Sequence, residues 1–120
     1  MTSVLIVEDE EALAALFQDL LTEEGYETYV AHDGRDALRQ LAEVQPDVVL
    51  SDVMLPFVTG LELARAMAAS PAHHTIPVIL MTAAGQGMVM DGTPYAAFLA
   101  KPFDLSRLIA TLERVLHPPP

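Results

Sequence analysis

Polar residues that can bind a metal ion or a phosphate group follow four separate apolar runs of this sequence. They are Glu8 and Asp9, then Asp52, then Thr82, and finally Lys101. Carboxylates are ligands for hard divalent cations, a hydroxyl group can donate a hydrogen bond to a phosphoryl oxygen, and an ammonium group neutralises negative charge. Lys101 is the only lysine of the chain, so any function that needs an ammonium group has this one candidate.

These residues can meet only if the apolar runs are neighbouring strands of a parallel sheet. Adjacent strands are about 4.8 Å apart, which brings Asp9, Asp52 and Thr82 within side-chain reach of one another. Lys101 then lies two strands from Asp52, roughly 10 Å between backbones, and a long lysine and a short aspartate can bridge that gap. Ligands of open parallel sheets bind at this carboxyl edge.

Carboxylates gathered at one point repel each other, and a bound cation is a common relief. Oxygen ligands favour Mg²⁺ or Mn²⁺, ions that often bridge protein carboxylates to a phosphate. The pattern therefore indicates phosphoryl chemistry. Asp52 is the expected nucleophile and would form an acyl phosphate, while the metal ion and Lys101 neutralise charge and Thr82 hydrogen-bonds a phosphoryl oxygen.

The elements that must position these residues alternate between strand and helix. Apolar runs rich in Val, Ile, Leu and Ala predict strands over 4–7, 28–31, 48–50, 78–81 and 97–100. Apolar residues at three- and four-residue steps predict one helix that stops at Gly25 and others that begin after Asp33, Thr59 and Asp104. The apolar stripe of the first helix is Ala12, Leu13, Leu16, Phe17, Leu20 and Leu21. This order is typical of an α/β fold with a mainly parallel sheet and helices on both faces.

The segment 84–94 interrupts this alternation where a further helix would be expected. It contains three glycines and a proline, and each interior glycine costs a helix roughly 1 kcal/mol. We therefore expect a loop there, or at most one short helical turn.

The composition fits one domain and excludes several classes of function. The chain has 120 residues and a formal net charge of -11, which opposes contact with nucleic acid or an anionic membrane surface. It has no cysteine, and no apolar run approaches the length of a membrane span. We expect a cytoplasmic protein with one domain over 1–117 and a proline tail over 118–120, without direct nucleic-acid contact or membrane insertion.

Four motifs at the predicted strand ends carry a family resemblance. They are VEDE at 7–10, DVMLP at 52–56 with Gly60 after it, MTA at 81–83, and KPF at 101–103. Together and in this order they resemble the receiver domain of bacterial two-component response regulators, of the single-domain, CheY-like kind. The resemblance implies a flavodoxin-like, doubly wound, five-stranded parallel sheet in the order 2-1-3-4-5.

The same resemblance assigns roles to individual residues. It implies a metal ion on the carboxylates of Asp9 and Asp52 and on the main-chain carbonyl of Met54, with Glu8 acting mostly through water. Lys101 would pair with the acceptor carboxylate or its phosphate, and the peptide bond between Lys101 and Pro102 would be cis.

A conformational switch is also implied by the resemblance. Thr82 would move toward the phosphoryl group, and the ring of Phe98 would turn inward to fill the vacated space. Thr82 and Lys101 are a few residues closer in sequence than is usual in the family, so we expect the fourth helix to be shortened or absent.

The sequence therefore predicts a phosphorelay protein that takes a phosphoryl group from a histidine kinase or phosphotransfer protein and passes the signal to a downstream protein target. It assists its own phosphorylation and is not a turnover enzyme. One alternative is a receiver-like interaction module that works without phosphorylation. Another is a phosphatase with an aspartyl nucleophile, although Met54 stands where such enzymes usually carry a second aspartate.

Overall fold

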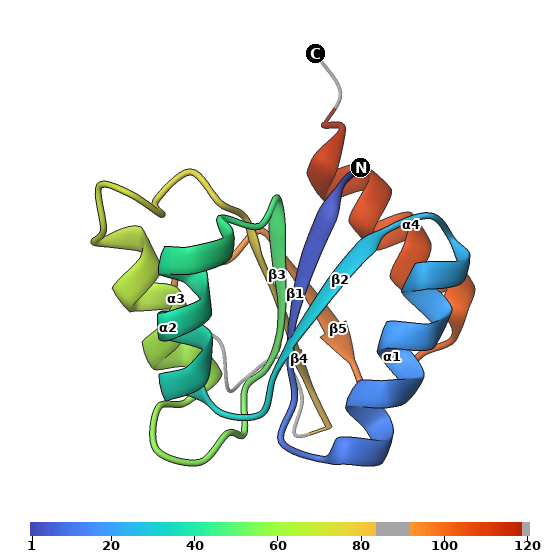
Figure 1. Ribbon diagram of the computed structural model, residues 1–120, viewed down its shortest axis with the longest axis horizontal. Coiled ribbons are helices and arrows are strands. Elements are labelled where there is room, and N and C mark those ends of the chain that lie inside the picture. The colour runs from blue at the N-terminus through green and yellow to red at the C-terminus, as the bar shows by residue number, and fades with distance from the viewer. Residues whose placement is uncertain (84–91, 119–120) are drawn as a thin grey trace.

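The computed structural model describes residues 1–83 and 92–118, which form a central parallel sheet between two layers of helices (Figure 1). The strand order is β2-β1-β3-β4-β5, as the family resemblance implies. The strands are β1 (Ser3–Val7), β2 (Glu27–Ala31), β3 (Val48–Asp52), β4 (Val78–Thr82) and β5 (Ala97–Ala100). The fold prediction is thus confirmed for the part of the chain that the structure describes.

The helices of the described residues cover both faces of the sheet. They are α1 (Glu11–Glu23), α2 (Gly34–Val44), α3 (Gly60–Ala68) and α4 (Leu105–Leu116). Figure 1 shows α2 and α3 on one side of the sheet and α1 and α4 on the other. Because helices lie on both sides, the three central strands β1, β3 and β4 are buried along their whole length, which explains their unbroken apolar sequences.

Three of the predicted helix starts are capped by the side chains that the sequence indicates. The carboxylates of Asp33 and Asp104 accept hydrogen bonds from the main-chain N–H groups of residues 36 and 107. Thr59 and Glu62 form a reciprocal capping box at the start of α3. These caps fix where each helix begins and therefore where the preceding loop must end.

The apolar stripe of α1 is narrower than its sequence pattern suggests. Phe17 and Leu21 are buried against the sheet, whereas the Leu16 side chain is 50% exposed. A leucine at a three- or four-residue step is thus not always a core residue, and this one borders a surface groove described below.

The turn from β3 into α3 depends on a glycine. A β-carbon at Gly60 would lie 2.3 Å from the carbonyl oxygen of Asp52, so no other residue fits here without displacing backbone. The Gly60 N–H also donates to the carbonyl oxygen of Val53 at 2.9 Å. The start of α3 is therefore packed directly on the end of the strand that carries Asp52.

The sequence predicts that the fourth helix of the family is shortened or absent. This prediction concerns mainly residues 84–91, which lie outside the described residues. Residues 92–96 are described and are not helical. Among the described residues no helix is both long enough and apolar enough to cross a membrane.

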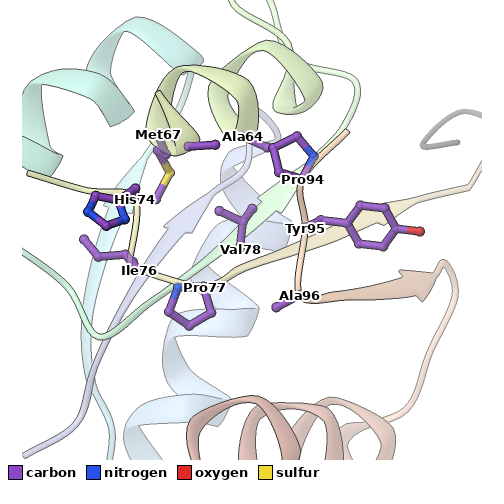
Figure 2. A pocket seen from close by; sticks show the side chains of 10 residues that line it. Ala64, Met67, His74, Ile76, Pro77, Val78, Pro94, Tyr95 and Ala96 are labelled. Carbon is purple, nitrogen blue, oxygen red and sulfur yellow. The ribbon is translucent and has the colours of Figure 1, made fainter. Parts of the chain in front are cut away.

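A pocket of about 230 Å³ lies at the amino edge of the sheet, away from the predicted site (Figure 2). It is bounded by Ala64 and Met67 of α3, by His74 and Ile76, and by residues 94–96 before β5. No carboxylate of the described residues lines it, so the chemistry expected from the sequence has to be sought at the opposite edge.

Candidate functional site

The register of the sheet brings the predicted site residues to one edge. Asp52 is the last residue of β3 and pairs with Met81 of β4, while Thr82 ends β4 and pairs with Ala100 of β5. Glu8 directly follows β1, and Lys101 directly follows β5. The four strands that end here are adjacent in the sheet, so the residues at their ends lie close together.

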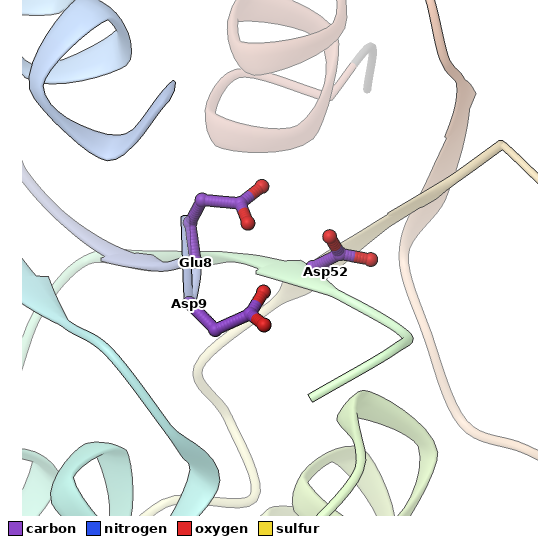
Figure 3. A group of neighbouring side chains, drawn as sticks. All are labelled: Glu8, Asp9 and Asp52. Carbon is purple, nitrogen blue, oxygen red and sulfur yellow. The ribbon is translucent and has the colours of Figure 1, made fainter. Parts of the chain in front are cut away.

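The side chains of Glu8, Asp9 and Asp52 lie close together at this edge of the sheet (Figure 3). One oxygen of each lies within 4.8 Å of an oxygen of the others. Glu8 is 1% exposed and Asp52 is 7% exposed, whereas Asp9 lies at the surface. Oxygen donors at these separations form a set that could hold a divalent cation such as Mg²⁺, and Asp9 is its solvent-exposed member.

The ammonium group of Lys101 bridges two of these carboxylates. Its Nζ lies 2.8 Å from Oε1 of Glu8 and 2.8 Å from Oδ2 of Asp52. Burial alone would lower the pKa of this ammonium, but the hydrogen bonds to Asp52 and Glu8 outweigh it, and the pKa lies above its ordinary value. Lys101 is therefore a fixed positive charge.

For Glu8 the balance between burial and hydrogen bonds is reversed, and burial has the larger effect on the pKa. Burial raises the pKa of its carboxyl group, and the hydrogen bonds from Lys101 and from the Glu10 N–H offset this only in part. The net result is a pKa above the ordinary value, because a buried carboxylate loses more hydration than these partners replace. A further positive charge beside Glu8 would favour its ionised form.

Asp52 is held at both carboxylate oxygens. The Met54 N–H donates to Oδ1 at 3.0 Å, and Lys101 donates to Oδ2 at 2.8 Å. The Met54 main chain therefore lies directly beside the acceptor, although the Met54 side chain is largely exposed. The role of its carbonyl group as a metal ligand stays a prediction.

An open pocket of about 380 Å³ adjoins Asp52. It is lined by Asp52, Met54, Thr82, Ala83 and Lys101. The Lys101 N–H donates to the carbonyl oxygen of Thr82 at 3.0 Å, which ties the ends of β4 and β5 together. The pocket thus offers space beside the acceptor, with an ammonium group and a hydroxyl residue on its walls.

The remaining predicted residues lie on β5 and directly after it. The peptide bond between Lys101 and Pro102 is cis. Phe98 lies on β5, is half-buried, and packs against the apolar cluster beneath α2 and α3. Its part in a switch stays a prediction.

Two contacts near the site involve residues that the sequence did not single out. His32 follows β2, and its Nδ1 lies 3.2 Å from the carbonyl oxygen of Glu8, which can only accept. The guanidinium carbon of Arg35 lies 3.6 Å from the centre of the Phe57 ring. Neither pair is close in sequence, so no spacing pattern could have indicated either one.

Comparison with known proteins identifies the family. Residues 4–113 match the sequence profile of the response regulator receiver domain. Transcriptional regulatory protein TrcR of Mycobacterium tuberculosis is 40% identical over 95% of this chain and 45% of its own length. Response regulator ArlR of Staphylococcus aureus is 34% identical over 100% of this chain and 55% of its own length. The chain therefore spans about half the length of these relatives.

Solved structures agree with this assignment. Chemotaxis response regulator CheY4 of Vibrio cholerae is 32% identical, with a TM-score of 0.89 over 97% of this chain and 99% of that one. The receiver domain of sensor histidine kinase PA1611 from Pseudomonas aeruginosa is 26% identical, with a TM-score of 0.85 over 96% and 97% of the two chains. The chain belongs to the response regulator receiver domain family.

The charge balance of the site predicts a pH-dependent effect of Lys101→Met. At about pH 7 we expect the free energy of unfolding to fall by about 3 kcal/mol, the lower end of the range for removing one member of a buried ion pair. Without the ammonium, the already raised pKa of Glu8 rises further. A carboxyl group with a raised folded-state pKa favours folding at low pH and loses that contribution as the pH rises through this pKa.

The deficit should therefore shrink as the pH falls from neutral toward the ordinary Glu value of 4.5. Urea unfolding at about pH 7 and about pH 5 measures it. Arg107→Met, which removes a positive charge from the exposed side of α4, is the control. An equal deficit at both pH values would contradict the proposed charge balance.

Proposed function

We propose that the chain is a phosphorelay component that accepts a phosphoryl group onto Asp52 in a reaction that depends on Mg²⁺ or Mn²⁺. One observation carries the proposal: Asp52 faces an open pocket while Lys101 bridges it to Glu8 beside the exposed Asp9. A carboxylate that is fixed, partly desolvated and next to a strong positive charge is suited to attack an electrophilic phosphorus.

In the transfer step the phosphoryl group moves intact from the donor imidazole to Asp52. A carboxylate oxygen of Asp52 forms a bond to phosphorus as the bond from phosphorus to the donor imidazole nitrogen breaks. The electron pair of that bond stays with the imidazole, which takes up a proton. Lys101 then balances charge on the phosphoryl oxygens, and Thr82 donates a hydrogen bond to one of them.

The residues suited to hold the metal ion are Asp9, Asp52 and the main-chain carbonyl of Met54, with Glu8 contributing through water. When bound, the ion neutralises negative charge on the transferring group. The PA1611 receiver domain was solved with a magnesium ion coordinated in its active-site cleft. The acidic donor set of this chain supports the same cofactor.

Phosphorylation is proposed to change the surface through Thr82 and Phe98. Thr82 is buried at the end of β4, and the Phe98 backbone pairs with β4 two residues earlier, at Leu80. A shift of Thr82 toward a phosphoryl group would open space on the adjacent strand, which the half-buried Phe98 ring would then enter. This packing change would alter affinity for a downstream protein target.

The proposed donor is a sensor histidine kinase or a histidine phosphotransfer protein. An apolar groove of about 400 Å³ runs between α1 and the start of α4, and it shares Ala83 and Lys101 with the acceptor pocket. Leu16 and the stacked rings of Phe17 and Phe103 line it. A donor that delivers its phosphohistidine to Asp52 has to cover this adjoining surface, so the groove suits an apolar helix face of that partner.

The proposal includes self-assisted phosphorylation without substrate turnover, a cytoplasmic location and no direct contact with nucleic acid. The lack of cysteine and the net charge of -11 support the last two points. An interaction module without phosphorylation would not need the bridged carboxylates beside an open pocket. A phosphatase of the aspartyl type would need a second aspartate two residues after Asp52, where the exposed Met54 stands.

The phosphorylation site is tested by intact mass. Incubation with Mg²⁺ and acetyl phosphate should add one phosphoryl group to the wild-type chain. Asp52→Asn should prevent this, because the amide lacks a nucleophilic carboxylate, and a chelator should prevent it in the wild type. Asp19→Asn, on the exposed side of α1, should be phosphorylated normally, and phosphorylation of the Asp52→Asn variant would refute the assignment.

The docking groove is tested by comparing two kinds of donor. Leu16→Ser should slow transfer from a phosphorylated sensor kinase by about five- to tenfold, since an interface side chain of this kind contributes about 1 kcal/mol or more. The rate with acetyl phosphate should not change. Leu38→Ser, at an exposed leucine of α2, is the control, and equal effects of both variants would contradict the placement of the donor.

A further inference from the structure

The loop between β3 and α3 contains an unusual backbone turn. Phe57 has a φ of 67°, a left-handed value that a large side chain seldom adopts. The Val58 N–H donates to the carbonyl oxygen of Pro56 at 2.8 Å, which closes a three-residue turn around Phe57. Turns of this hand are rare and strained, and they persist only where their surroundings hold them.

One of those surroundings is the side chain of Arg35. Its guanidinium carbon lies 3.6 Å from the centre of the Phe57 ring, although Phe57 as a residue is 67% exposed. A guanidinium group over an aromatic face is attracted by the ring's negative charge distribution. Arg35 belongs to the first turn of α2, so this contact joins the helix to the loop.

The backbones of α2 and the loop also touch. A β-carbon on Gly34 would lie 2.2 Å from the carbonyl oxygen of Val58, so the start of α2 is already at the closest possible approach. The loop is therefore held against α2 at two successive positions, by Gly34 through backbone packing and by Arg35 through its side chain. Truncation of the Arg35 side chain removes the second of these contacts and leaves the first in place.

The other end of the same loop holds the acceptor. The Met54 N–H donates to Asp52, and the Leu55 N–H donates to the carbonyl oxygen of Val53 at 3.1 Å. Only Leu55 and Pro56 separate Met54 from Phe57. The hydrogen bond from the Gly60 N–H to the carbonyl oxygen of Val53 joins the two ends of the loop. A change in the Phe57 turn thus has few bonds over which to relax before it reaches Met54.

We propose that Arg35 is a positioning residue for the acceptor site: by holding the Phe57 ring, it keeps the Met54 main chain against Asp52. The part of this inference that concerns the metal ion rests on the proposed function. The part that concerns the Met54 N–H does not. Arg35 does not touch the reacting atoms and acts only through the loop.

The metal-free protein gives the first test. Amide hydrogen exchange at Met54, followed by NMR, should be about two- to fivefold faster in Arg35→Met, the effect expected for loss of an exposed contact between a cation and a ring. Arg35→Lys should restore part of the protection, since an ammonium can occupy the same face. Arg39→Met removes an equal charge one turn along α2, where the arginine pairs with Asp36 and Glu43 instead, and should leave Met54 unchanged.

Mg²⁺ affinity, measured by calorimetry, gives the second test. Loss of a positive charge alone would tighten Mg²⁺ binding, so Arg39→Met should bind equally well or better than wild type. Arg35→Met should bind about two- to fivefold more weakly than Arg39→Met, which has the same net charge. Phe57→Leu, which keeps the charge, should bind about two- to fivefold more weakly than wild type, and Phe57→Tyr should bind like wild type. The double variant of Arg35→Met and Phe57→Leu should bind no more weakly than either single variant.

The outcomes distinguish a failure of the proposed function from a failure of the positioning role of Arg35. A wild-type protein that neither binds Mg²⁺ nor accepts phosphate would refute the proposed function, while the Met54 exchange would still test Arg35. Equal Met54 exchange in Arg35→Met and Arg39→Met would overturn the positioning role. Additive effects of Arg35→Met and Phe57→Leu on Mg²⁺ affinity would overturn it as well, because the two residues would then act independently. Unfolding in urea shows that each variant is folded.

Discussion

The site depends on one ammonium group that balances carboxylates at the end of a parallel sheet. Lys101 pairs with Glu8 and with Asp52, each at 2.8 Å, and Asp9 adds a further negative charge at the surface. One cation opposite three acids leaves the cluster short of positive charge, which a divalent ion can supply. The same shortage is the physical basis for our proposal that the site receives a phosphoryl group only together with a metal ion. The open Asp9 side and the pocket beside Asp52 are where these two partners would meet.

The sheet makes this arrangement possible by bringing distant segments to one edge. Glu8 and Lys101 are far apart in sequence, and they meet because β1, β3, β4 and β5 are adjacent and parallel. Helices on both faces keep β3 and β4 buried, and Asp52 and Thr82 are the last residues of these strands. Gly60 and the capping box of Thr59 then return the chain at once into α3. This short return leaves Met54 facing the acceptor.

The sequence predicted the parts of this structure that depend on local pattern. Buried strands have continuous apolar runs, and Asp33, Thr59 and Asp104 carry side chains that cap helices, so strand and helix positions could be read directly. The strand ends that carry the acids and the lysine followed from those positions. The sharing of Lys101 between Glu8 and Asp52, and the contact of Arg35 with Phe57, depend on side-chain direction across the sheet edge. Leu16 shows the limit of pattern alone, because helical spacing placed it with core residues and the structure leaves it half exposed.

The position of a bound cation tests this account most directly. Crystals grown with Mn²⁺ can be measured for anomalous scattering, which locates the ion without prior assumptions. The account predicts one strong peak between the carboxylates of Asp9 and Asp52 and the carbonyl oxygen of Met54, with Lys101 still in contact with Asp52. No peak there at saturating Mn²⁺, or a peak at another place with the ammonium of Lys101 turned away from Asp52, would contradict it.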